Sequence, residues 1–474
     1  MKTIFEKSTG VDGVSFGEKE YKKYLDKEFL REEQIGIPQV SELEVLRHYK
    51  ELSDRNFCIE KGFYPLGSCT MKYNPKVNEL LASLERFTNL HPLQSDNDSQ
   101  GALELMYKLQ NALKYLTGMD GVTLQPAAGA HGELTGMMII KKYFEHKGEK
   151  NRTKVIVPDS AHGTNPASAK MCGFDIIEVK SDSKGQVDIN SLKSLLDKDV
   201  AAIMMTNPNT LGIFEEKVLE ISDIMHKNGS LLYYDGANFN AIMGWTNPKL
   251  MGFDVVHLNL HKTFSTPHGG GGPGAGPVCV REELKDFLPS PVIEYDGEKY
   301  YRNYNIAHSI GKVRGFYGNF GVLVRAYAYI LMMGDNLKLA SADAVLNANY
   351  IKEKLKQYYD LPYDEPCMHE FVLSGEKQHH QGVSTLGIAK RLMDSNCHPP
   401  TVYFPLIVHE AIMIEPTESE SKSVLDGFID TMIKIAHEIE QNPEEVLKSP
   451  QKTPIGKVDE TLAARKPDLV FKEL

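Results

Sequence analysis

The chain has 474 residues, a formal net charge of −11, and 41% hydrophobic and 25% charged residues, the composition of an ordinary globular protein. Its length exceeds the size at which a single core stops growing, so about two or three domains are expected. The acidic balance offers no basic face to a phosphate backbone and argues against nucleic-acid binding. The most apolar stretch, 322–333, contains Arg325 and is shorter than the roughly 20 residues of a membrane span, so no membrane association is expected.

Six cysteines are scattered along the chain without a C-x-x-C pair, and the N-terminal residues lack the apolar stretch of a secretory signal. These features predict reduced thiols and a cytoplasmic protein, not a disulfide framework. His257 and His261 stand four apart, as helical zinc ligands do. The glutamate of H-E-x-x-H is missing, however, and the segment has the pattern of a strand, so no metal site is expected.

Residues 1–95 predict an N-terminal arm of helices and loops that ends in an irregular loop at 62–75. Residues 96–330 alternate between helical and strand patterns and predict a large domain. Helices are expected at 103–116, 133–145, 189–196 and 218–228, and strands at 154–157, 175–179, 201–206, 230–235 and 254–260. This alternation is typical of an α/β fold with a mostly parallel, doubly wound sheet covered on both faces.

A helical pattern at 319–358 leads into a smaller C-terminal α/β domain, assigned to 331–445. Its expected strands are 369–373 and 411–415, and its expected helices are 385–395 and 420–441. The remaining segment, 446–474, is a charged tail to which no structure is assigned.

Lys262 follows the apolar run 254–260 and precedes a glycine-rich stretch, which predicts a strand that ends at the lysine. Open α/β sheets bind ligands at the carboxyl ends of their strands. A partly desolvated lysine at such a position could form a Schiff base with pyridoxal phosphate. The alternative is a surface lysine that happens to follow a core strand.

Three other segments have features that a pyridoxal-phosphate site needs. Gly129 and Ala130 lead into a helix whose N-terminus could bind the phosphate, although a plain helix start is an alternative. His162 follows a strand and could lie over the pyridine ring, although single histidines are more often structural. Asp235 ends an apolar strand and could pair with a protonated pyridine nitrogen, where the alternative is a turn residue.

Several hydroxyl and amide side chains are expected to complete this site. Asn207 and Thr210 follow the strand at 201–206 and could reach the phenolic oxygen of the cofactor or the substrate. Thr263 and Thr266 could donate their hydroxyl groups to the phosphate. The glycine run comes after the lysine, so it is not a Walker A loop.

The chain resembles the glycine decarboxylase P protein of the glycine cleavage system, and more closely subunit 2 of its bacterial two-subunit form. The resemblance covers about residues 35–450 and rests on the segments G-S-C-T-M-K-Y-N-P, H-P-L-Q, Q-P-A-A-G-A-H-G-E, D-S-A-H-G-T-N-P-A-S-A, T-N-P-N-T-L-G-I-F-E, Y-D-G-A-N and H-L-N-L-H-K-T-F-S-T-P-H-G-G-G-G-P-G. It implies a fold-type-I pyridoxal-phosphate enzyme in which Lys262 forms the Schiff base, Asp235 pairs with the pyridine nitrogen and His162 stacks on the ring.

The resemblance also implies an activity and partners. The cofactor would form an aldimine with glycine, carbon dioxide would leave, and the aminomethyl group would pass to the lipoyl group of the H protein. The expected partner is a homologous subunit 1 that lacks the lysine, in an assembly with two copies of each subunit. His261 and His91 are candidates for steering or acid–base work, and Cys69, Thr70 and Lys72 lie in a loop that could close over the substrate or pack against a partner.

Two alternatives remain open from the sequence. Another pyridoxal-phosphate enzyme, for example one similar to serine hydroxymethyltransferase or another amino-acid decarboxylase, would use the same cofactor segments without a lipoyl carrier. A non-catalytic assembly subunit could bind the cofactor without turnover.

Overall fold

The computed structural model describes residues 2–8, 26–33, 36–269 and 274–469. Internal contacts divide the chain into two compact units, Met1–Lys61 and Gly62–Leu474. The first unit contains a short 3-10 helix, η2 (Lys27–Phe29), and helix α1 (Glu42–Arg55). A capping box begins α1: the Ser41 side chain accepts the Glu44 N–H, and the Glu44 carboxylate accepts the Ser41 N–H.

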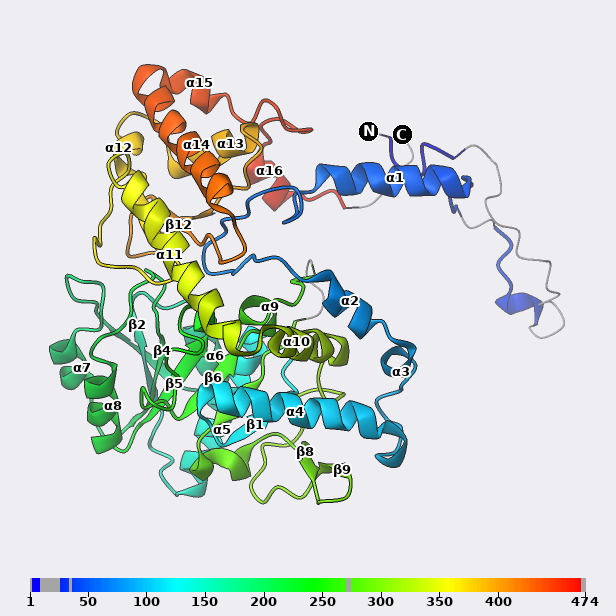
Figure 1. The fold of residues 1–474 in the computed structure, drawn as a ribbon, viewed down its shortest axis with the longest axis vertical. Coiled ribbons are helices and arrows are strands. Elements are labelled where there is room, and N and C mark those ends of the chain that lie inside the picture. Colours follow the sequence, from blue (N-terminus) through cyan, green and yellow to red (C-terminus); the bar gives the residue numbers. More distant parts are fainter. Residues whose placement is uncertain (1, 9–25, 34–35, 270–273, 470–474) are drawn as a thin grey trace. The chain divides into compact units, whose positions relative to one another are not determined.

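The second unit is built on a seven-stranded sheet (Figure 1). Its strands are β1 (Gly121–Thr123), β2 (Lys154–Pro158), β3 (Asp175–Val179), β4 (Val200–Thr206), β5 (Leu231–Gly236), β6 (Val255–Leu258) and β7 (Val278–Val280), in the spatial order β1-β7-β6-β5-β4-β2-β3. Strands β3, β2, β4, β5 and β6 run parallel to one another, whereas β7 runs antiparallel to both β1 and β6. The predicted mostly parallel sheet is confirmed.

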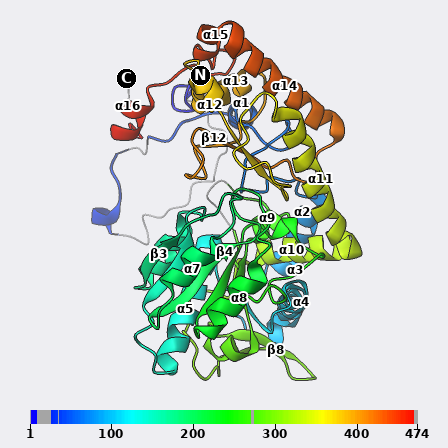
Figure 2. The ribbon, with the colours of Figure 1, turned by 90° about the vertical axis from the view of Figure 1, so that its left-hand side faces the viewer.

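Helices cover both faces of this sheet (Figure 2). They are α4 (Gln100–Thr117), α5 (Gly129–His146), α6 (Thr164–Met171), α7 (Ile189–Leu195) and α8 (Val218–Lys227). Successive strand residues enter opposite cores: Tyr233 packs in the core that contains α5, and Tyr234 in the core that contains α4 and α8. All seven residues of β4 are buried, as expected of a strand covered on both sides.

Shorter elements surround the sheet. They are α2 (Lys76–Ala82), α3 (Glu85–Thr88), α9 (Leu260–Thr263), the hairpin of β8 (Val292–Tyr295) and β9 (Tyr300–Asn303), and the 3-10 helices η3 (Asn97–Ser99), η4 (Phe239–Ala241), η5 (Glu282–Phe287) and η6 (Gly334–Asn336). The helical stretch predicted at 319–358 is helical along most of its length. It is two helices, α10 (Phe320–Met333) and α11 (Leu337–Leu355), which are interrupted at Gly334, a residue with φ +50°.

Helix α11 leads from the large core to a smaller one. Its Leu337 belongs to the core of the seven-stranded sheet, whereas Ile351 and Leu355 belong to the second core. The second core lies under a three-stranded antiparallel sheet in the order β10-β12-β11. The elements of this region are β10 (Phe371–Ser374), β11 (Thr401–Val402), β12 (Ala411–Ile414), α12 (Glu376–His379), α13 (Thr385–Asp394), α14 (Lys422–Gln441), α15 (Pro443–Leu447) and α16 (Glu460–Arg465).

The last two helices lie partly or wholly in the segment to which the sequence assigned no structure. Helix α15 is anchored by the buried Val446, whereas no residue of α16 is buried. Among the residues that the structure describes, no helix has both the length and the apolar character needed to cross a membrane.

Candidate active site

The candidate site is a cavity of about 280 Å³ at the carboxyl ends of strands β4, β5 and β6. This is where parallel α/β sheets bind their ligands. Its lining consists of Ser68, Ala128, Gly129, Ala130, Glu133, His162, Thr164, Thr206, Thr210, Asp235, Ala237, Asn238, His257, Asn259, His261 and Lys262. Segments far apart in the sequence therefore converge on Lys262.

Lys262 lies one turn beyond the strand and not at its end. Strand β6 ends at Leu258, and residues Leu260–Thr263 form the one-turn helix α9. The predicted strand 254–260 begins one residue before β6 and extends two residues beyond its end, because the backbone turns to helix after Asn259. The Leu260 N–H donates to the carbonyl oxygen of Ala275, which fixes α9 against the segment that follows the glycine run. The lysine is half-buried in this position.

The N-terminus of α5 forms one end of the cavity. Ala128, Gly129 and Ala130 line it there, and the first N–H groups of an 18-residue helix form a favourable anion site. A Cβ on Gly129 would lie 2.7 Å from Nδ2 of Asn259, whose Oδ1 is buried without a hydrogen-bond partner. A Cβ on Gly276 would lie 2.1 Å from the Ala128 carbonyl oxygen. The close backbone packing, the N–H groups at the helix start and the Nδ2 donor of Asn259 fit a phosphate.

Asp235 lies near the carboxyl end of β5, and it is 3% exposed. Its Oδ2 accepts from Asn165 Nδ2 at 2.8 Å, and its Oδ1 accepts from the Ala237 N–H at 2.9 Å. His257 Nε2 lies 3.3 Å from the same Oδ1. Burial alone would raise the pKa of Asp235, but His257 and the hydrogen bond from Asn165 outweigh it and hold the pKa below its usual value. The site therefore keeps Asp235 as an anion.

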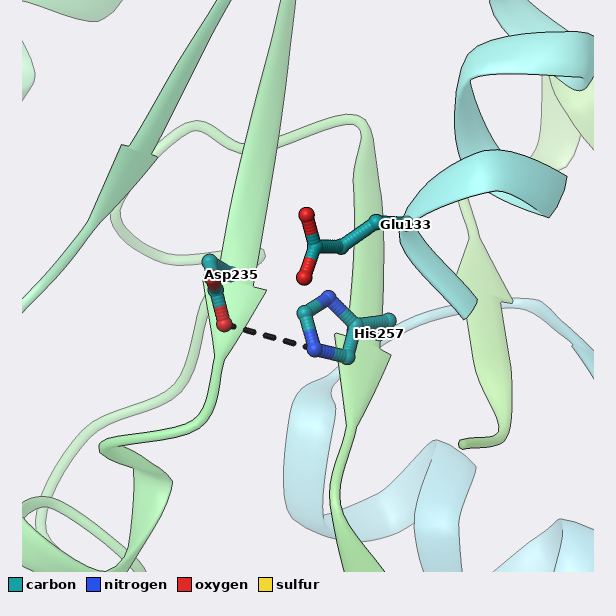
Figure 3. Close-up of side chains that lie close together, drawn as sticks. All are labelled: Glu133, Asp235 and His257. Atoms are coloured by element: carbon teal, nitrogen blue, oxygen red, sulfur yellow. Dashed lines mark ion pairs between the residues drawn. The ribbon is translucent and has the colours of Figure 1, made fainter. Parts of the chain in front are cut away.

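Glu133 and His257 belong to the same cluster but were not predicted as site residues (Figure 3). Glu133 is 3% exposed and His257 is 1% exposed. Burial, followed by repulsion from Asp235, raises the pKa of Glu133. The sequence offered one signal for Glu133, a glutamate that directly follows the run of small residues before the helix predicted at 133–145. The signal for His257 was the alternating direction of side chains along a strand. This alternation places His257 of β6 on the same face of the sheet as Tyr233 and Asp235 of the neighbouring strand β5.

Two groups of buried side chains have the spacing of metal ligands. The ligand atoms of Glu133, Asp235 and His257 lie within 4.8 Å of one another, as do those of His369, Glu370 and Glu415. In the first group, the Tyr233 hydroxyl and the Asp235 carboxylate engage both nitrogens of His257. These two contacts give His257 a role that needs no ion.

His162 lies in the cavity as predicted, with its ring 5.4 Å from that of Phe404 in an edge-on arrangement. Burial lowers the pKa of His162, so the ring is neutral at pH 7. Its Nδ1 lies 2.8 Å from Thr164 Oγ1 and accepts the Thr164 N–H at 3.2 Å. Thr210 also lines the cavity, and its hydroxyl donates to the Ser160 carbonyl oxygen.

His261 lines the cavity beside Lys262. Burial, together with the charges of His268 and Lys262, lowers the pKa of His261 to about 3. Its imidazole is therefore neutral at pH 7, and its Nδ1 is buried without a hydrogen-bond partner. In this state the ring could accept a proton from a reacting group but would not begin as an acid.

Four predicted site residues are not part of the cavity lining: Asn207, Thr263, Thr266 and His91. Asn207 is fully buried, and its Oδ1 accepts the Glu215 N–H. Thr263 is also fully buried, and its hydroxyl is not part of the lining. His91 lines a separate cavity of about 90 Å³, where its ring lies 6.5 Å from that of Phe316. Local sequence places each of them next to a motif, but the direction of a side chain depends on packing.

The 62–75 loop reaches the cavity through Ser68. Two buried carboxyl groups from the smaller sheet region hold it: the Ser68 N–H donates to Glu370 Oε2 at 2.7 Å, and the Thr70 N–H donates to Glu415 Oε2 at 2.8 Å. Ser68 and Thr70 both have positive φ, 61° and 48°. Glu370 also accepts from Asn238 Nδ2 at 3.1 Å. Burial raises the pKa of both glutamates, most strongly that of Glu370, where repulsion from Glu415 adds to it.

Solved structures share this architecture. A crystal structure of glycine decarboxylase (P-protein) of the glycine cleavage system, in inhibitor-bound form, has a TM-score of 0.72 and 18% identity over 87% of this chain and 94% of its own. A sphingosine-1-phosphate lyase from Burkholderia pseudomallei has a TM-score of 0.65 and 13% identity over 90% and 96%. A NifS-like protein has a TM-score of 0.60 and 16% identity over 79% and 100%. The chain has the fold of the fold-type-I pyridoxal-phosphate enzymes, as predicted.

Closer relatives identify the family. The family model "Glycine cleavage system P-protein" matches residues 22–302, and the model "Glycine dehydrogenase, C-terminal domain" matches residues 340–455. A probable glycine dehydrogenase (decarboxylating) subunit 2 from Caldanaerobacter subterraneus is 60% identical over 451 residues, which cover 95% of this chain and 93% of the relative. A protein of the same description from Listeria monocytogenes is 58% identical over 480 aligned residues, covering 100% and 98%. The chain belongs to the glycine cleavage system P-protein family.

Proposed function

We propose that this chain is the cofactor-bearing subunit of a glycine decarboxylase. In this proposal it binds pyridoxal phosphate at Lys262, releases carbon dioxide from glycine, and passes the aminomethyl group to the lipoyl group of an H protein. The observation that carries the proposal is the meeting of Lys262, Asp235 and the N-terminus of α5 in one cavity. The description of the relatives as glycine dehydrogenase (decarboxylating) subunit 2 supports the choice of glycine.

The residues of the cavity suit the two ends of the cofactor. The N–H groups at the start of α5 and the amide of Asn259 would bind the phosphate. Asp235 would keep a proton on the pyridine nitrogen, because its anionic carboxylate favours the charged ring. When bound, the cofactor supplies an electron sink for the pair of electrons that remains when carbon dioxide leaves.

Other residues would act around the ring and the substrate. His162 would cover one ring face as a neutral imidazole. Lys262 would hold the cofactor covalently and, once glycine has displaced it, would be free to move a proton at its Nζ. Ser68, held by Glu370, would close the side of the cavity that faces the smaller sheet and exclude water.

The partners follow from the same proposal. The relatives are described as a subunit 2, which supports the pairing of this chain with a homologous subunit 1 that lacks the lysine. The H protein would deliver the lipoyl group as the acceptor. We place the assembly in the cytoplasm, where the unpaired cysteines of the sequence would remain reduced.

Exchange of labelled bicarbonate into the carboxyl group of glycine tests the proposed activity. We expect exchange in the presence of subunit 1 and lipoylated H protein. Lys262→Ala should reduce it to background, because the variant lacks the amine that holds the cofactor. Lys170→Ala, on the exposed end of α6, is the matched control and should exchange at the wild-type rate. Absence of exchange with all components present would contradict the proposal, and exchange that ignores the H protein would indicate another decarboxylase.

A further inference from the structure

Glu133 is part of a hydrogen-bond chain that joins the residue beneath the proposed pyridine nitrogen to the residue over the proposed ring face. Glu133 Oε2 accepts from Asn165 Nδ2 at 2.9 Å, and the same amide nitrogen donates to Asp235 Oδ2 at 2.8 Å. On its other side, Glu133 Oε1 lies 2.8 Å from Thr164 Oγ1, which lies 2.8 Å from His162 Nδ1. One buried carboxyl group therefore connects the two sides of the site.

The single hydroxyl hydrogen of Thr164 can be donated either to Glu133 Oε1 or to His162 Nδ1, each 2.8 Å away. Asn165 Nδ2 carries two hydrogens and donates one to Glu133 and one to Asp235. His162 Nδ1 already accepts the Thr164 N–H, so that nitrogen is unprotonated and can accept a hydrogen bond from the Thr164 hydroxyl as well. If the hydroxyl donates to His162, its oxygen must accept from Glu133. Glu133 can donate only when it carries a proton.

We propose that Glu133 is a protonated carboxylic acid in the resting protein and that it positions Asp235 and His162 for the cofactor. The hydrogen bonds then run without conflict from the Glu133 hydroxyl to Thr164 and from Thr164 to His162. On the other side, the Tyr233 hydroxyl lies 2.7 Å from His257 Nδ1, and His257 Nε2 lies 3.3 Å from Asp235 Oδ1. Asp235 retains an unused lone pair for the pyridine N–H. The inference deepens the proposed cofactor site and rests on it.

Electrostatics favour the same state. The titratable groups that face Glu133 are Asp235, Tyr233 and His257. Thr164, Asn165 and Ser168 of α6 add only uncharged hydrogen-bonding groups. Burial and then repulsion from Asp235 raise the pKa of Glu133, whereas the pKa of Asp235 is lowered. Two carboxylates bridged by one amide would repel each other in a buried site, and a proton on one of them removes this repulsion.

Substitution by glutamine provides a direct test, because its amide reproduces the protonated acid. In Glu133→Gln, the NH₂ group can donate to Thr164 and the carbonyl oxygen can accept from Asn165. Glu133→Ala removes both contacts. Glu145→Gln, on the exposed last turn of the same helix, is the matched control. Thr164→Val breaks the chain at its next link and leaves Glu133 in place.

Two measurements on the full-length variants separate the outcomes. We expect the infrared difference spectrum between cofactor-free wild type and Glu133→Gln to show the carbonyl stretch of a protonated carboxyl group. We also expect pyridoxal phosphate to bind Glu133→Gln within about threefold of wild type. Glu133→Ala and Thr164→Val should bind it roughly tenfold or more weakly, because each leaves a buried polar group unpaired. Glu145→Gln should match wild type.

The results that would overturn the inference differ from those that would overturn the proposed function. A carboxylate band in the infrared difference spectrum, or binding by Glu133→Gln that is as weak as that by Glu133→Ala, would show that Glu133 acts as an anion. Failure of the wild type itself to bind pyridoxal phosphate would refute the proposed cofactor. The infrared spectrum of the cofactor-free protein would still report the protonation state of Glu133 in that case.

Discussion

Asp235 and Glu133 are neighbouring buried carboxyl groups whose pKa values are shifted in opposite directions. Burial acts on Asp235 and Glu133 alike, yet Asp235 receives hydrogen bonds from Asn165 and the Ala237 backbone and lies beside His257. Glu133 contacts the uncharged side chains of Thr164, Asn165 and Ser168 and faces the charge of Asp235. His257 beside Asp235, and the charge of Asp235 beside Glu133, therefore favour Asp235 as the carboxyl group that ionises.

A residue-scale prediction concerns the thiol of Cys69, which lies between the two backbone groups held by Glu370 and Glu415. Burial raises the pKa of Cys69 to about 11. At pH 8 the thiolate fraction should therefore be about one in a thousand, since it changes tenfold for each pH unit. We expect iodoacetamide to label the exposed Cys58 well before Cys69.

Peptide mapping after timed alkylation measures both sites in one sample. The rate at Cys69 should rise about tenfold for each pH unit towards pH 11, because only the thiolate reacts. Urea-unfolded protein is the control, in which both cysteines should react at similar rates. Labelling of Cys69 in the native protein as fast as that of Cys58 at pH 8 would refute the buried, protonated thiol.

The sequence predicted individual site residues where a motif and a strand end coincided. Lys262, Asp235, His162, Gly129, Ala130 and Thr210 all line the cavity. Asn207 follows β4 just as Thr210 does, but its amide turns inward to cap the Glu215 N–H. Such a choice between two neighbouring side chains depends on contacts with residues distant in the sequence.

At the scale of elements, the start of α5 packs against the segment that leads into β7. The Gly276 N–H donates to the Pro126 carbonyl oxygen, and a Cβ on Gly276 would lie 2.1 Å from the Ala128 carbonyl oxygen. Backbone atoms cannot yield as the end of a flexible side chain can. Gly276 therefore sets how closely the chain leading into β7 approaches the proposed phosphate site.

We predict that Gly276→Ala destabilises the protein by about 1–3 kcal/mol, the usual cost of overpacking a buried site. The same change should weaken pyridoxal phosphate binding, because it displaces the start of α5. Gly427→Ala is the matched control: Gly427 lies in α14 with open space around its Cα, and alanine there should add about 0.5–1 kcal/mol.

Chemical denaturation measures the unfolding free energy of the two variants, and titration with pyridoxal phosphate measures their cofactor affinity. Equal unfolding free energies for Gly276→Ala and wild type would mean that the backbone contact relaxes without cost. If Gly427→Ala also bound the cofactor more weakly, the weaker binding of Gly276→Ala could not be attributed to a displaced start of α5.

The elements themselves were predicted where their periodicity was long and regular. Strands β2 to β5 and helices α4, α5, α8, α13 and α14 lie within a few residues of the predicted ranges. The three-residue strands β1 and β7 were missed, because so short a segment carries no periodicity. Helix α6 was missed because its small and polar residues, T-N-P-A-S-A-K-M, lack an apolar stripe.

At the scale of the whole molecule, the site needs residues from both cores of the second unit. The seven-stranded sheet supplies Asp235, His257 and Lys262, whereas Glu370 and Glu415 come from the smaller sheet region and hold the Ser68–Thr70 loop. The sequence predicted both sheets and a function for the loop. It could not predict that carboxyl groups some 300 residues away hold the loop by its backbone, because the 302- and 345-residue separations leave no local pattern.

The central claim, that Lys262 holds the cofactor, is tested most directly by borohydride reduction of the protein loaded with pyridoxal phosphate, followed by peptide mapping. Reduction converts a lysine–cofactor linkage into a stable label. We predict a pyridoxyl group on Lys262 and its loss in Lys262→Ala, with the Gln125–Glu133 and Asp235 segments unlabelled. A label that forms on another lysine, or equal labelling of Lys262→Ala and wild type, would contradict the account.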